Sequence, residues 1–469
     1  MKLPAQFEDT MRQLLGDEYN AFRTALLGEP AVSIRLNRAK CAAQPEYEPV
    51  PWTTDGYYLP ERPAFTFDPW LHAGCYYVQE ASSMFVEQAL HQHLGEARVA
   101  LDLCAAPGGK STLLRSLLPD DCVLVSNEVM RPRAQVLAEN ITKWGHPRCI
   151  VTSNYPADFT PMGPTFDLIL VDAPCSGEGM FRKDEVAVAE WSPENVTTCW
   201  QRQRDILTDI WPTLRPGGLL IYSTCTFNTQ EDEENVRWMM EELGAELLPI
   251  ATDPSWGITP SLVSDVAHAY RFLPGRTRGE GFFLSVLRKG NEVAGATTPR
   301  PAKAKKKDKK NSSAAKALPP WGDKRGASWL TDAQAYTYKT LDAEVIALSS
   351  DMEALHSMLA DHLHLIKAGI TLAELKGRDA FPAHDLAMST ALRTDAFARC
   401  ELNYLDALRY LRREAIVLPA DMPRGFVLVT YRDMPLGFVK NLGNRANNLY
   451  PNEWRIRSPH LPKSEARVI

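Results

Sequence analysis

The sequence Asp102-Leu103-Cys104-Ala105-Ala106-Pro107-Gly108-Gly109-Lys110-Ser111 decides the fold. It overlaps a short apolar run, Val99–Leu103, and leads into a stretch with helical periodicity from about Lys110 to Leu118. Small residues let a backbone approach a ligand closely, and the amino end of a helix offers free N–H groups. The glycine spacing differs from that of a phosphate-binding GxxxxGK[ST] loop. We therefore expect a strand, a ligand-binding turn and a helix, which is the unit of an α/β sheet.

The same alternation of strand-like and helix-like segments continues along the chain. Phe166–Val171 is an almost wholly apolar run, as expected for a strand that is buried on both faces of a parallel sheet. The pattern predicts further strands at Val123–Ser126, Leu219–Ser223 and Phe282–Leu287, and helices at Arg131–Trp144, Gln201–Leu214 and Glu231–Leu243. The predicted fold class is therefore α/β, with a Rossmann-like core.

A carboxylate closes the second predicted strand. Glu128 lies about 20 residues beyond the glycines of the turn, the place where Rossmann-like folds hold the hydroxyl groups of a ribose. A Gly-Gly turn alone is more often structural than functional. The turn, the strand and the acid in register together indicate a nucleoside-binding site.

Two cysteines follow two neighbouring strands. Asp172-Ala173-Pro174-Cys175-Ser176-Gly177 comes after the strand at Phe166–Val171, and Ser223-Thr224-Cys225-Thr226-Phe227-Asn228 comes after the next one. The carboxyl ends of parallel strands lie at the edge of the sheet where ligands bind. We therefore expect Cys175, Cys225 and Asp172 to converge on the edge that carries the turn, an arrangement that core packing does not explain.

Two thiols and an acid suit the methylation of carbon 5 of cytosine. This carbon is a poor nucleophile until a thiolate adds to carbon 6 and makes an enamine-like adduct. The thiol must lose its proton, and an acid near nitrogen 3 can stabilise the charge that develops. From the chemistry alone, either Cys175 or Cys225 is the nucleophile. A cysteine directly after proline, as in Pro174-Cys175, is also the arrangement of DNA cytosine methyltransferases.

The composition predicts a soluble, reduced, cytoplasmic protein. Hydrophobic residues make up 45% and charged residues 23% of the 469 residues, which fits several globular domains. The chain begins without the apolar run of a secretory signal, and no stretch is long enough for a membrane helix. The nine cysteines lack the spacing of a zinc site, so no metal is expected. The net charge of −6 does not by itself indicate a nucleic-acid partner.

The first 75 residues are predicted to form a small unit of mixed helix and strand. It has an amphipathic helix at Phe7–Leu15 and a strand at Ala31–Asn37. Arg35, Arg38 and Lys40 lie beside that strand. Basic residues at a strand edge can contact phosphates, but solvated surface charge is the default interpretation.

A lysine-rich stretch at residues 291–318 separates the core from the C-terminal region. It predicts a disordered linker, either a plain tether or a basic arm that captures RNA by charge. Beyond it we expect an amphipathic helix at Asp395–Arg413 and a β-hairpin made by Gly425–Tyr431 and Pro435–Gly443. Basic and aromatic residues interleave after this hairpin, which suits RNA binding and would equally suit a packed barrel rim.

Together these motifs resemble the Nop/Sun family of RNA cytosine carbon-5 methyltransferases. The resemblance is greatest to its bacterial RsmF-like branch, which modifies ribosomal RNA. The resemblance covers nearly the whole chain. It rests on DLCAAPGGKS at Asp102–Ser111, DAPCSGEGMFRKD at Asp172–Asp184, STCTFNTQEDEENV at Ser223–Val236, QEASSM at Gln79–Met84 and NLYPNEWRIR at Asn448–Arg457.

The resemblance implies an S-adenosylmethionine-dependent enzyme with a class I methyltransferase core, a small α+β N-terminal unit and a β-rich, PUA-like C-terminal region. In it, Cys225 would be the nucleophile, and Cys175 would assist release of the methylated RNA from the covalent adduct. Asp172 would lie at the cofactor and the target base, and Lys110 would order the site near it. The residues implied to hold the methionine part of the cofactor are Cys104, Ala105, Ala106, Pro107, Gly108, Gly109 and Lys110, with Glu128 at its ribose.

The implied domains are an RNA-binding appendage at 1–75, the methyltransferase domain at 76–290, the linker at 291–318, an intermediate segment at 319–394 and an RNA-binding domain at 395–469. The implied substrate is one cytosine of small-subunit ribosomal RNA, in free RNA or in an assembling subunit. The enzyme would be a monomer with no membrane partner. Transfer RNA is an alternative substrate. A non-catalytic ribosome-assembly protein is an alternative class, but it would be expected to lack one of the two cysteines or the glycines of the turn.

One position departs from the family pattern. The family commonly carries an acid after the third strand that contacts the adenine of the cofactor. This chain reads Ser153-Asn154-Tyr155-Pro156-Ala157-Asp158, with tyrosine where the aspartate is often found. Asn154 and Asp158 are the candidates to replace it.

Overall fold

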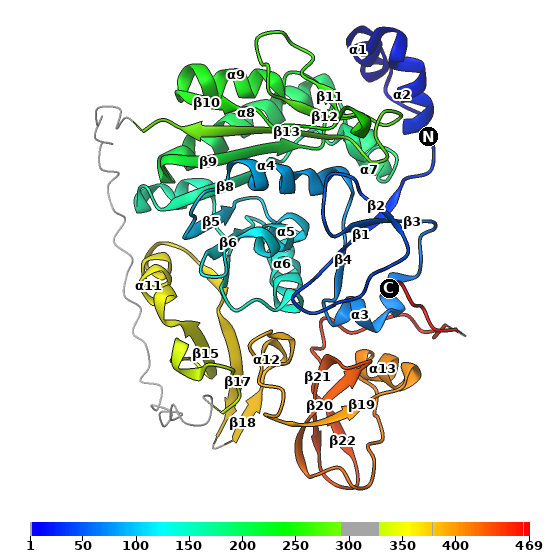
Figure 1. Ribbon diagram of the computed structural model, residues 1–469, viewed down its shortest axis with the longest axis vertical. Helices are drawn as coiled ribbons and strands as arrows, with labels where there is room; N and C mark the ends of the chain where they lie inside the picture. The colour runs from blue at the N-terminus through cyan, green and yellow to red at the C-terminus, as the bar shows by residue number, and fades with distance from the viewer. Residues whose placement is uncertain (1, 292–327, 378, 463) are drawn as a thin grey trace.

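The computed structural model describes residues 2–291 and 328–469, apart from residues 378 and 463. At its centre is a mixed sheet in which β9, β8, β5, β6 and β7 are neighbours and run parallel (Figure 1). β13 extends the sheet antiparallel beside β9, and β16 does so beside β7. In spatial order the strands are β11 (Thr259–Pro260), β12 (Tyr270–Phe272), β13 (Phe282–Lys289), β9 (Leu214–Thr224), β8 (Phe166–Asp172), β5 (Val99–Asp102), β6 (Val123–Asn127), β7 (Cys149–Thr152) and β16 (Leu365–Ala368), with β10 (Ala245–Leu248) also paired to β13.

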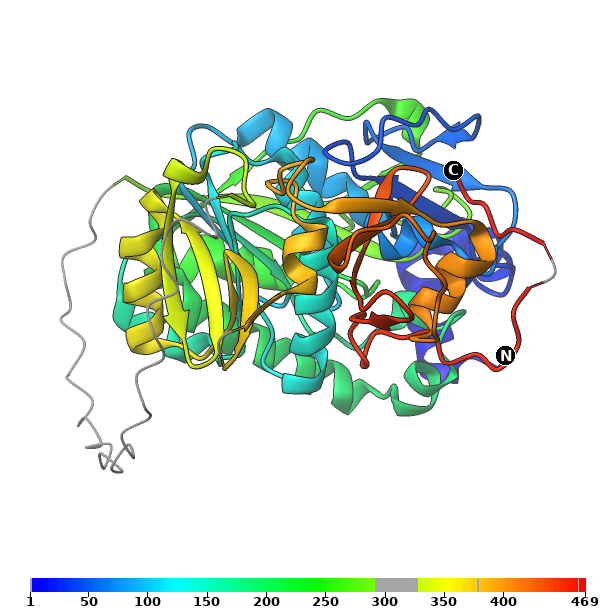
Figure 2. The ribbon, with the colours of Figure 1, turned by 90° about the horizontal axis from the view of Figure 1, so that it is seen from below.

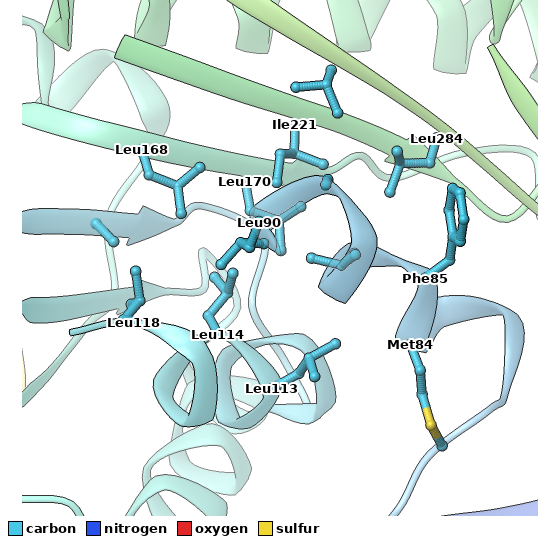
Figure 3. Packing of buried hydrophobic residues seen from close by; sticks show 14 of the residues in the cluster. Met84, Phe85, Leu90, Leu113, Leu114, Leu118, Leu168, Leu170, Ile221 and Leu284 are labelled. Atoms are coloured by element: carbon cyan, nitrogen blue, oxygen red, sulfur yellow. The ribbon is translucent and has the colours of Figure 1, made fainter. Parts of the chain in front are cut away.

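Helices cover both faces of this sheet because its strands are apolar on both sides. In β8, Leu168 and Leu170 belong to the core on one face, and Ile169 and Val171 to the core on the other. Figure 3 shows part of the first core, where side chains of α4 and α5 pack against the strands. The helices on this face are α4 (Val86–His93), α5 (Gly109–Leu117) and α6 (Arg131–Trp144), and those on the other are α8 (Pro193–Ile210), α9 (Glu233–Glu242) and α11 (Glu353–His362). The expected Rossmann-like α/β core is confirmed.

The helix expected at Gln201–Leu214 is the element of the core that lies farthest from its prediction. It begins at Pro193, where Ser192 Oγ accepts a hydrogen bond of 3.1 Å from Asn195 N, and it ends at Ile210. Pro212 follows in a short turn and has no N–H with which to continue the helix. Leu214 is therefore already the first residue of β9, a longer strand than the one expected.

The N-terminal unit is an antiparallel sheet flanked by short helices. Its strands lie in the order β2 (Glu48–Pro49), β3 (Gly56–Leu59), β1 (Val32–Leu36) and β4 (Tyr76–Val78). Its helices are α1 (Ala5–Leu15), α2 (Tyr19–Leu26) and α3 (Pro69–His72).

The interpretation of the basic residues near β1 as surface groups is wrong for two of the three. Arg35 is buried, and its guanidinium donates hydrogen bonds to Gln79 Oε1 (2.8 Å) and to Thr112 Oγ1 on α5 (2.7 Å). Lys40 is half-buried, and its ammonium donates to two backbone carbonyl oxygens at 2.6 and 2.9 Å. Only Arg38 is exposed. Arg35 and Lys40 therefore join the N-terminal unit to the core, and their hydrogen bonds compensate for the loss of water.

Residues 328–394 form strands that were not predicted. β14 (Tyr336–Leu341), β15 (Glu344–Ser349), β17 (Ile370–Lys376) and β18 (Asp379–Pro382) make a sheet of their own, which Figure 2 shows beside the central one. β16, from the same segment, pairs with β7. The chain after the linker thus completes one edge of the central sheet. Residues 292–318 of the expected linker lie outside the described residues.

The C-terminal sheet contains the expected hairpin. β20 (Gly425–Tyr431) and β21 (Met434–Asn441) are joined by Arg432 and Asp433. Both turn residues have positive φ, which the two-residue turns of tight hairpins require. The turn is one residue shorter than expected, since Met434 already belongs to β21.

The single helix expected at Asp395–Arg413 is wrong. Ala398–Glu401 instead forms β19, which pairs parallel to β20, and α13 spans only Tyr404–Leu411. Asn403 causes the break, because its side chain accepts a hydrogen bond of 3.0 Å from Asp406 N and so caps the start of the helix. The remaining elements of this region are β22 (Ala446–Asn448), beside β21, and α12 (His384–Met388).

The N- and C-terminal units pack against each other. Buried apolar residues from both form one cluster, and both views of the ribbon show the C-terminal strands next to α3 (Figures 1 and 2). Tyr404 donates a hydrogen bond to Phe67 O (3.1 Å), and Tyr47 donates one to Val468 O (2.9 Å). The N-terminal sheet, α3 and the C-terminal region therefore form one block beside the core.

Two further expectations concern the chain as a whole. All nine cysteines lie in the described parts and are free, as expected for reduced thiols. Among the helices of residues 2–291 and 328–469, none is long and apolar enough to cross a membrane.

Candidate active site

The turn after β5 is held firmly at the carboxyl edge of the sheet. Gly108 has a φ of +119°, in the left-handed region that favours glycine, and α5 begins at the next residue. Ala105 N donates to Asn127 O (2.8 Å), and Asn140 Nδ2 donates to Pro107 O (2.8 Å). These bonds fix the turn and leave the amino end of α5 available to a ligand.

A cavity of about 460 Å³ lies against this turn and brings together most of the predicted site residues. Gly108, Glu128 and Cys175 are the three that do not line it. Glu128 is buried just after β6, where its Oε1 accepts a hydrogen bond of 2.9 Å from Met130 N. The predicted residues that line the cavity are Cys104, Ala105, Ala106, Pro107, Gly109, Lys110, Asp172 and Cys225.

The N-terminal unit forms one wall of this cavity, which was not predicted from the sequence. Ser33 from β1 and Tyr77 from β4 line it, followed by Gln79 and Glu80. The QEASSM motif was a signal for this wall, because it starts at Gln79 and appears in the family pattern without an assigned role. This cavity is therefore shared between the N-terminal unit and the central α/β core.

The two predicted cysteines lie side by side, with 3.2 Å between their Sγ atoms. The loops that carry them also touch through Gly179, whose N–H donates to Cys225 O at 2.8 Å. A Cβ atom on Gly179 would lie 2.7 Å from that oxygen and 2.8 Å from Cα of Gly281, so a side chain there would push the loops apart. Of the two thiols, only Cys225 lines the cavity.

Two buried carboxylates, neither of which was predicted as a site residue, hold these loops in place. Glu178 Oε2 accepts hydrogen bonds from Thr226 Oγ1 (2.7 Å) and from the next two backbone N–H groups (2.8 and 3.0 Å). Glu231 Oε2 accepts one from Ser176 N (3.0 Å). Both acids lie within the quoted family motifs, and this is the only signal for them in the sequence.

Aromatic residues of the N-terminal helices support the same loops. Phe7 of α1 packs against Phe181, with 5.0 Å between ring centres, and Phe22 of α2 packs against Phe227 at 5.1 Å. Phe227 comes two residues after Cys225. The N-terminal unit therefore contributes to the position of the thiols as well as to the wall of the cavity.

An ion pair lies at the edge of the cavity beside the thiols. Lys110 Nζ is 2.9 Å from Asp172 Oδ2, and Ser223 Oγ donates to Asp172 Oδ1 at 2.8 Å. Burial alone would lower the pKa of Lys110, but the charge and hydrogen bond of Asp172, together with Cys225, raise it. The ammonium group therefore stays charged and holds the carboxylate at the edge of the cavity.

The contact between the two thiols changes the pKa of Cys175. The pKa of Cys175 is raised well above its usual value, first by the hydrogen bond to Cys225 and then by burial. Cys175 therefore keeps its proton and can donate a hydrogen bond to the sulfur of Cys225. One thiol faces the cavity, and the other supports it with a hydrogen bond.

Asp102, the last residue of β5, is a fully buried acid next to this site. Its Oδ2 accepts a hydrogen bond of 2.6 Å from Ser111 Oγ, and its Oδ1 has no partner among the described residues. Burial raises the pKa of Asp102 to about 7, and the bond from Ser111 only partly opposes this.

Asp102→Asn is expected to reduce the loss of stability that the protein suffers as the pH rises. An unfolded aspartate ionises near pH ~3.9. Between that pH and about 7, the folded state keeps a proton that the unfolded state has lost, so stability falls with rising pH. From about pH 5 to about pH 8 the wild type should lose about 2 kcal/mol more than the variant. Urea unfolding without cofactor measures this. The exposed Asp120→Asn variant should behave as wild type, and equal losses in all three proteins would contradict the prediction.

The candidates for the adenine contact are partly committed to other bonds. Asn154 Nδ2 donates to His364 O (3.2 Å), and its Oδ1 accepts from His364 N (2.9 Å), which ties β16 to the sheet. Asp158 Oδ2 accepts a hydrogen bond of 2.9 Å from Tyr155 N, and the Tyr155 side chain is exposed. None of the three lines the cavity.

Comparisons with known proteins agree along most of the chain. The family model described as 16S rRNA methyltransferase RsmB/F matches residues 88–288, that of the N-terminal domain of 16S rRNA methyltransferase RsmF matches 3–81, and that of the methyltransferase RsmF PUA domain matches 397–456. Ribosomal RNA small subunit methyltransferase F of Pectobacterium atrosepticum is 31% identical over 96% of this chain and 95% of its own. The protein of that name from Erwinia tasmaniensis is 28% identical over 96% of each. A solved methyltransferase homolog from Pyrococcus horikoshii shares 27% identity at a TM-score of 0.53, over 61% of this chain and 94% of its own.

Proposed function

The chain belongs to the RsmB/RsmF family of 16S rRNA methyltransferases, and we propose that it methylates carbon 5 of one cytosine in small-subunit ribosomal RNA. The methyl donor is S-adenosylmethionine. The observation that carries the proposal is the pair of thiols 3.2 Å apart, with Cys225 facing the cavity that begins at the turn after β5. The Lys110–Asp172 ion pair lines the same cavity.

The residues present fit the cofactor. The volume of about 460 Å³ falls within the range of about 300–1,000 Å³ for small-ligand sites. The small residues of the turn and the free amino end of α5 suit the charged methionine part. We assign this part to residues 104–110, the ribose to Glu128, and the boundary between cofactor and base to Asp172. When bound, the cofactor supplies an electrophilic methyl group.

The protein's own residues prepare and release the cytosine. The thiolate of Cys225 adds to carbon 6, forming a C–S bond and making carbon 5 nucleophilic. The ammonium group of Lys110 stabilises the negative charge that develops on the ring, and Asp172 holds that ammonium in place. Once carbon 5 is methylated, it loses its proton to solvent water, the C5=C6 double bond re-forms, and the thiolate of Cys225 leaves. The S–H group of Cys175 donates a hydrogen bond to that departing sulfur.

We also propose how the RNA reaches the site. The N-terminal unit (residues 1–75) and the PUA domain (within residues 395–469) hold the RNA, and the cytosine is extruded from its stack into the cavity, as base-modifying enzymes require. The enzyme acts in the cytoplasm as a monomer, on ribosomal RNA or an assembling ribosomal subunit.

Bisulfite sequencing of RNA from cells with and without the gene tests the proposed function. Bisulfite deaminates cytosine but spares 5-methylcytosine. One cytosine of small-subunit RNA should therefore lose its protection in the deletion strain and regain it with the wild-type gene, but not with Cys225→Ala. Loss of protection in a transfer RNA instead would show that transfer RNA is the substrate. Unchanged protection in both RNAs would refute the proposal.

A further inference from the structure

A second cavity, of about 580 Å³, continues from the catalytic one. The two cavities share three lining residues, Ala31, Val32 and Arg62. The outer cavity is bounded by residues 28–32, which lead into β1, by residues 59–62 at the end of β3, and by residues 274, 275 and 277–279. It therefore gives the catalytic cavity an extension along the N-terminal unit, with Arg62 at the junction.

Arg62 differs from the other cations that line these cavities. Lys110 is paired with Asp172, while Arg182 and Lys183 are both paired with Glu280 and Arg278 with Glu48. Arg62 is exposed and has neither an ion pair nor a hydrogen bond within the parts of the chain that the structure describes. Its guanidinium lies 5.6 Å from the ring of Phe65. Glu29 and Glu61 also line the outer cavity, but neither pairs with Arg62. Arg62 therefore carries an uncompensated positive charge where the two cavities meet.

We propose that the outer cavity holds the nucleotide next to the target cytosine, and that Arg62 binds the phosphodiester group between the two. This inference rests on the proposed function. An extruded base draws its backbone to the mouth of the catalytic cavity, so a phosphate must lie near the junction. A guanidinium group binds phosphate oxygens through two parallel hydrogen bonds, and its charge is not already neutralised here.

The outer cavity suits a backbone contact rather than the reading of a base. None of its lining residues, all of which the structure describes, is aromatic. Proteins that hold single-stranded RNA by its bases usually stack them on aromatic rings. The contact should therefore be independent of the neighbouring base and sensitive to salt.

The test compares Arg62→Ala and Arg62→Lys with wild type in their binding of short single-stranded oligocytidine and oligouridine RNA, by fluorescence anisotropy over a range of salt concentrations. Arg62→Ala should bind both RNAs about tenfold more weakly. The slope of log affinity against log salt concentration should correspond to about one phosphate contact fewer than in wild type. Arg62→Lys should keep the salt dependence and recover part of the affinity. Arg202→Ala, which removes an exposed arginine of α8 outside both cavities, is the matched control and should behave as wild type.

Equal affinity of Arg62→Ala and wild type for both RNAs would overturn the proposal, and so would a loss confined to one RNA, which would indicate that Arg62 reads a base. In methylation assays Arg62→Ala should raise the KM for RNA about tenfold and keep kcat. A fall in kcat at unchanged KM would also overturn it. If the wild type bound RNA through Arg62 but methylated no ribosomal cytosine, the proposed function would fail and the phosphate site would stand.

Discussion

Cys225→Ala is expected to abolish methylation, with a fall in kcat of at least ~10³-fold. Cys225 is the thiol that lines the cavity, and without addition to carbon 6 the carbon 5 of cytosine has too little nucleophilicity to react. Transfer of a radiolabelled methyl group from S-adenosylmethionine to ribosomal RNA measures the loss. Binding of the cofactor and of RNA should be little changed, because the substitution removes a single sulfur atom.

RNA that contains 5-fluorocytidine provides the control for this assignment. Fluorine at carbon 5 cannot leave as a proton does, so the wild type should remain covalently attached to such RNA after methyl transfer. Cys225→Ala should form no adduct, whereas Cys199→Ala, which removes a buried thiol of α8 outside the cavity, should form it normally. If Cys225→Ala formed the adduct and Cys175→Ala did not, the proposed roles of the two thiols would have to be exchanged.

The core of the fold could be predicted because its signals are local. The apolar runs of the parallel strands and the turn at residues 102–111 are each readable within a few residues. The convergence of Cys175 and Cys225 followed from topology, because loops after neighbouring parallel strands meet at one edge of the sheet. The structure places the two sulfur atoms in contact at that edge.

The features that could not be predicted depend on contacts between distant parts of the chain. β16 is a short strand whose partner, β7, lies far back in the sequence, so no local pattern marks their pairing. Arg35, Glu178 and Glu231 carry charges that suggest exposure, but each is buried among hydrogen-bond partners that only the folded chain provides. These buried charges join the N-terminal unit to the core and hold the two cysteine loops, so the support of the site was harder to predict than its chemistry.

Cys175→Ala should give a different defect from Cys225→Ala, namely an enzyme that reacts once and stays attached to its RNA. The raised pKa of Cys175 keeps its thiol protonated at 3.2 Å from the sulfur of Cys225. A hydrogen bond from that thiol stabilises the thiolate that leaves carbon 6, and removing it slows this step without preventing the addition. Turnover should fall at least ~10²-fold, and a protein–RNA band should accumulate on a denaturing gel when S-adenosylmethionine is present.

The band must depend on Cys225 if it is the proposed adduct, so Cys175→Ala combined with Cys225→Ala should show none. Cys175→Ser retains a proton donor at the same position and should release RNA faster than Cys175→Ala, which a merely structural role for the thiol would not produce. A Cys175→Ala enzyme that turns over normally, or one that is inactive without an adduct, would contradict this role. In the second case Cys175 would be needed for the addition itself, and the two thiols would act as one nucleophilic unit.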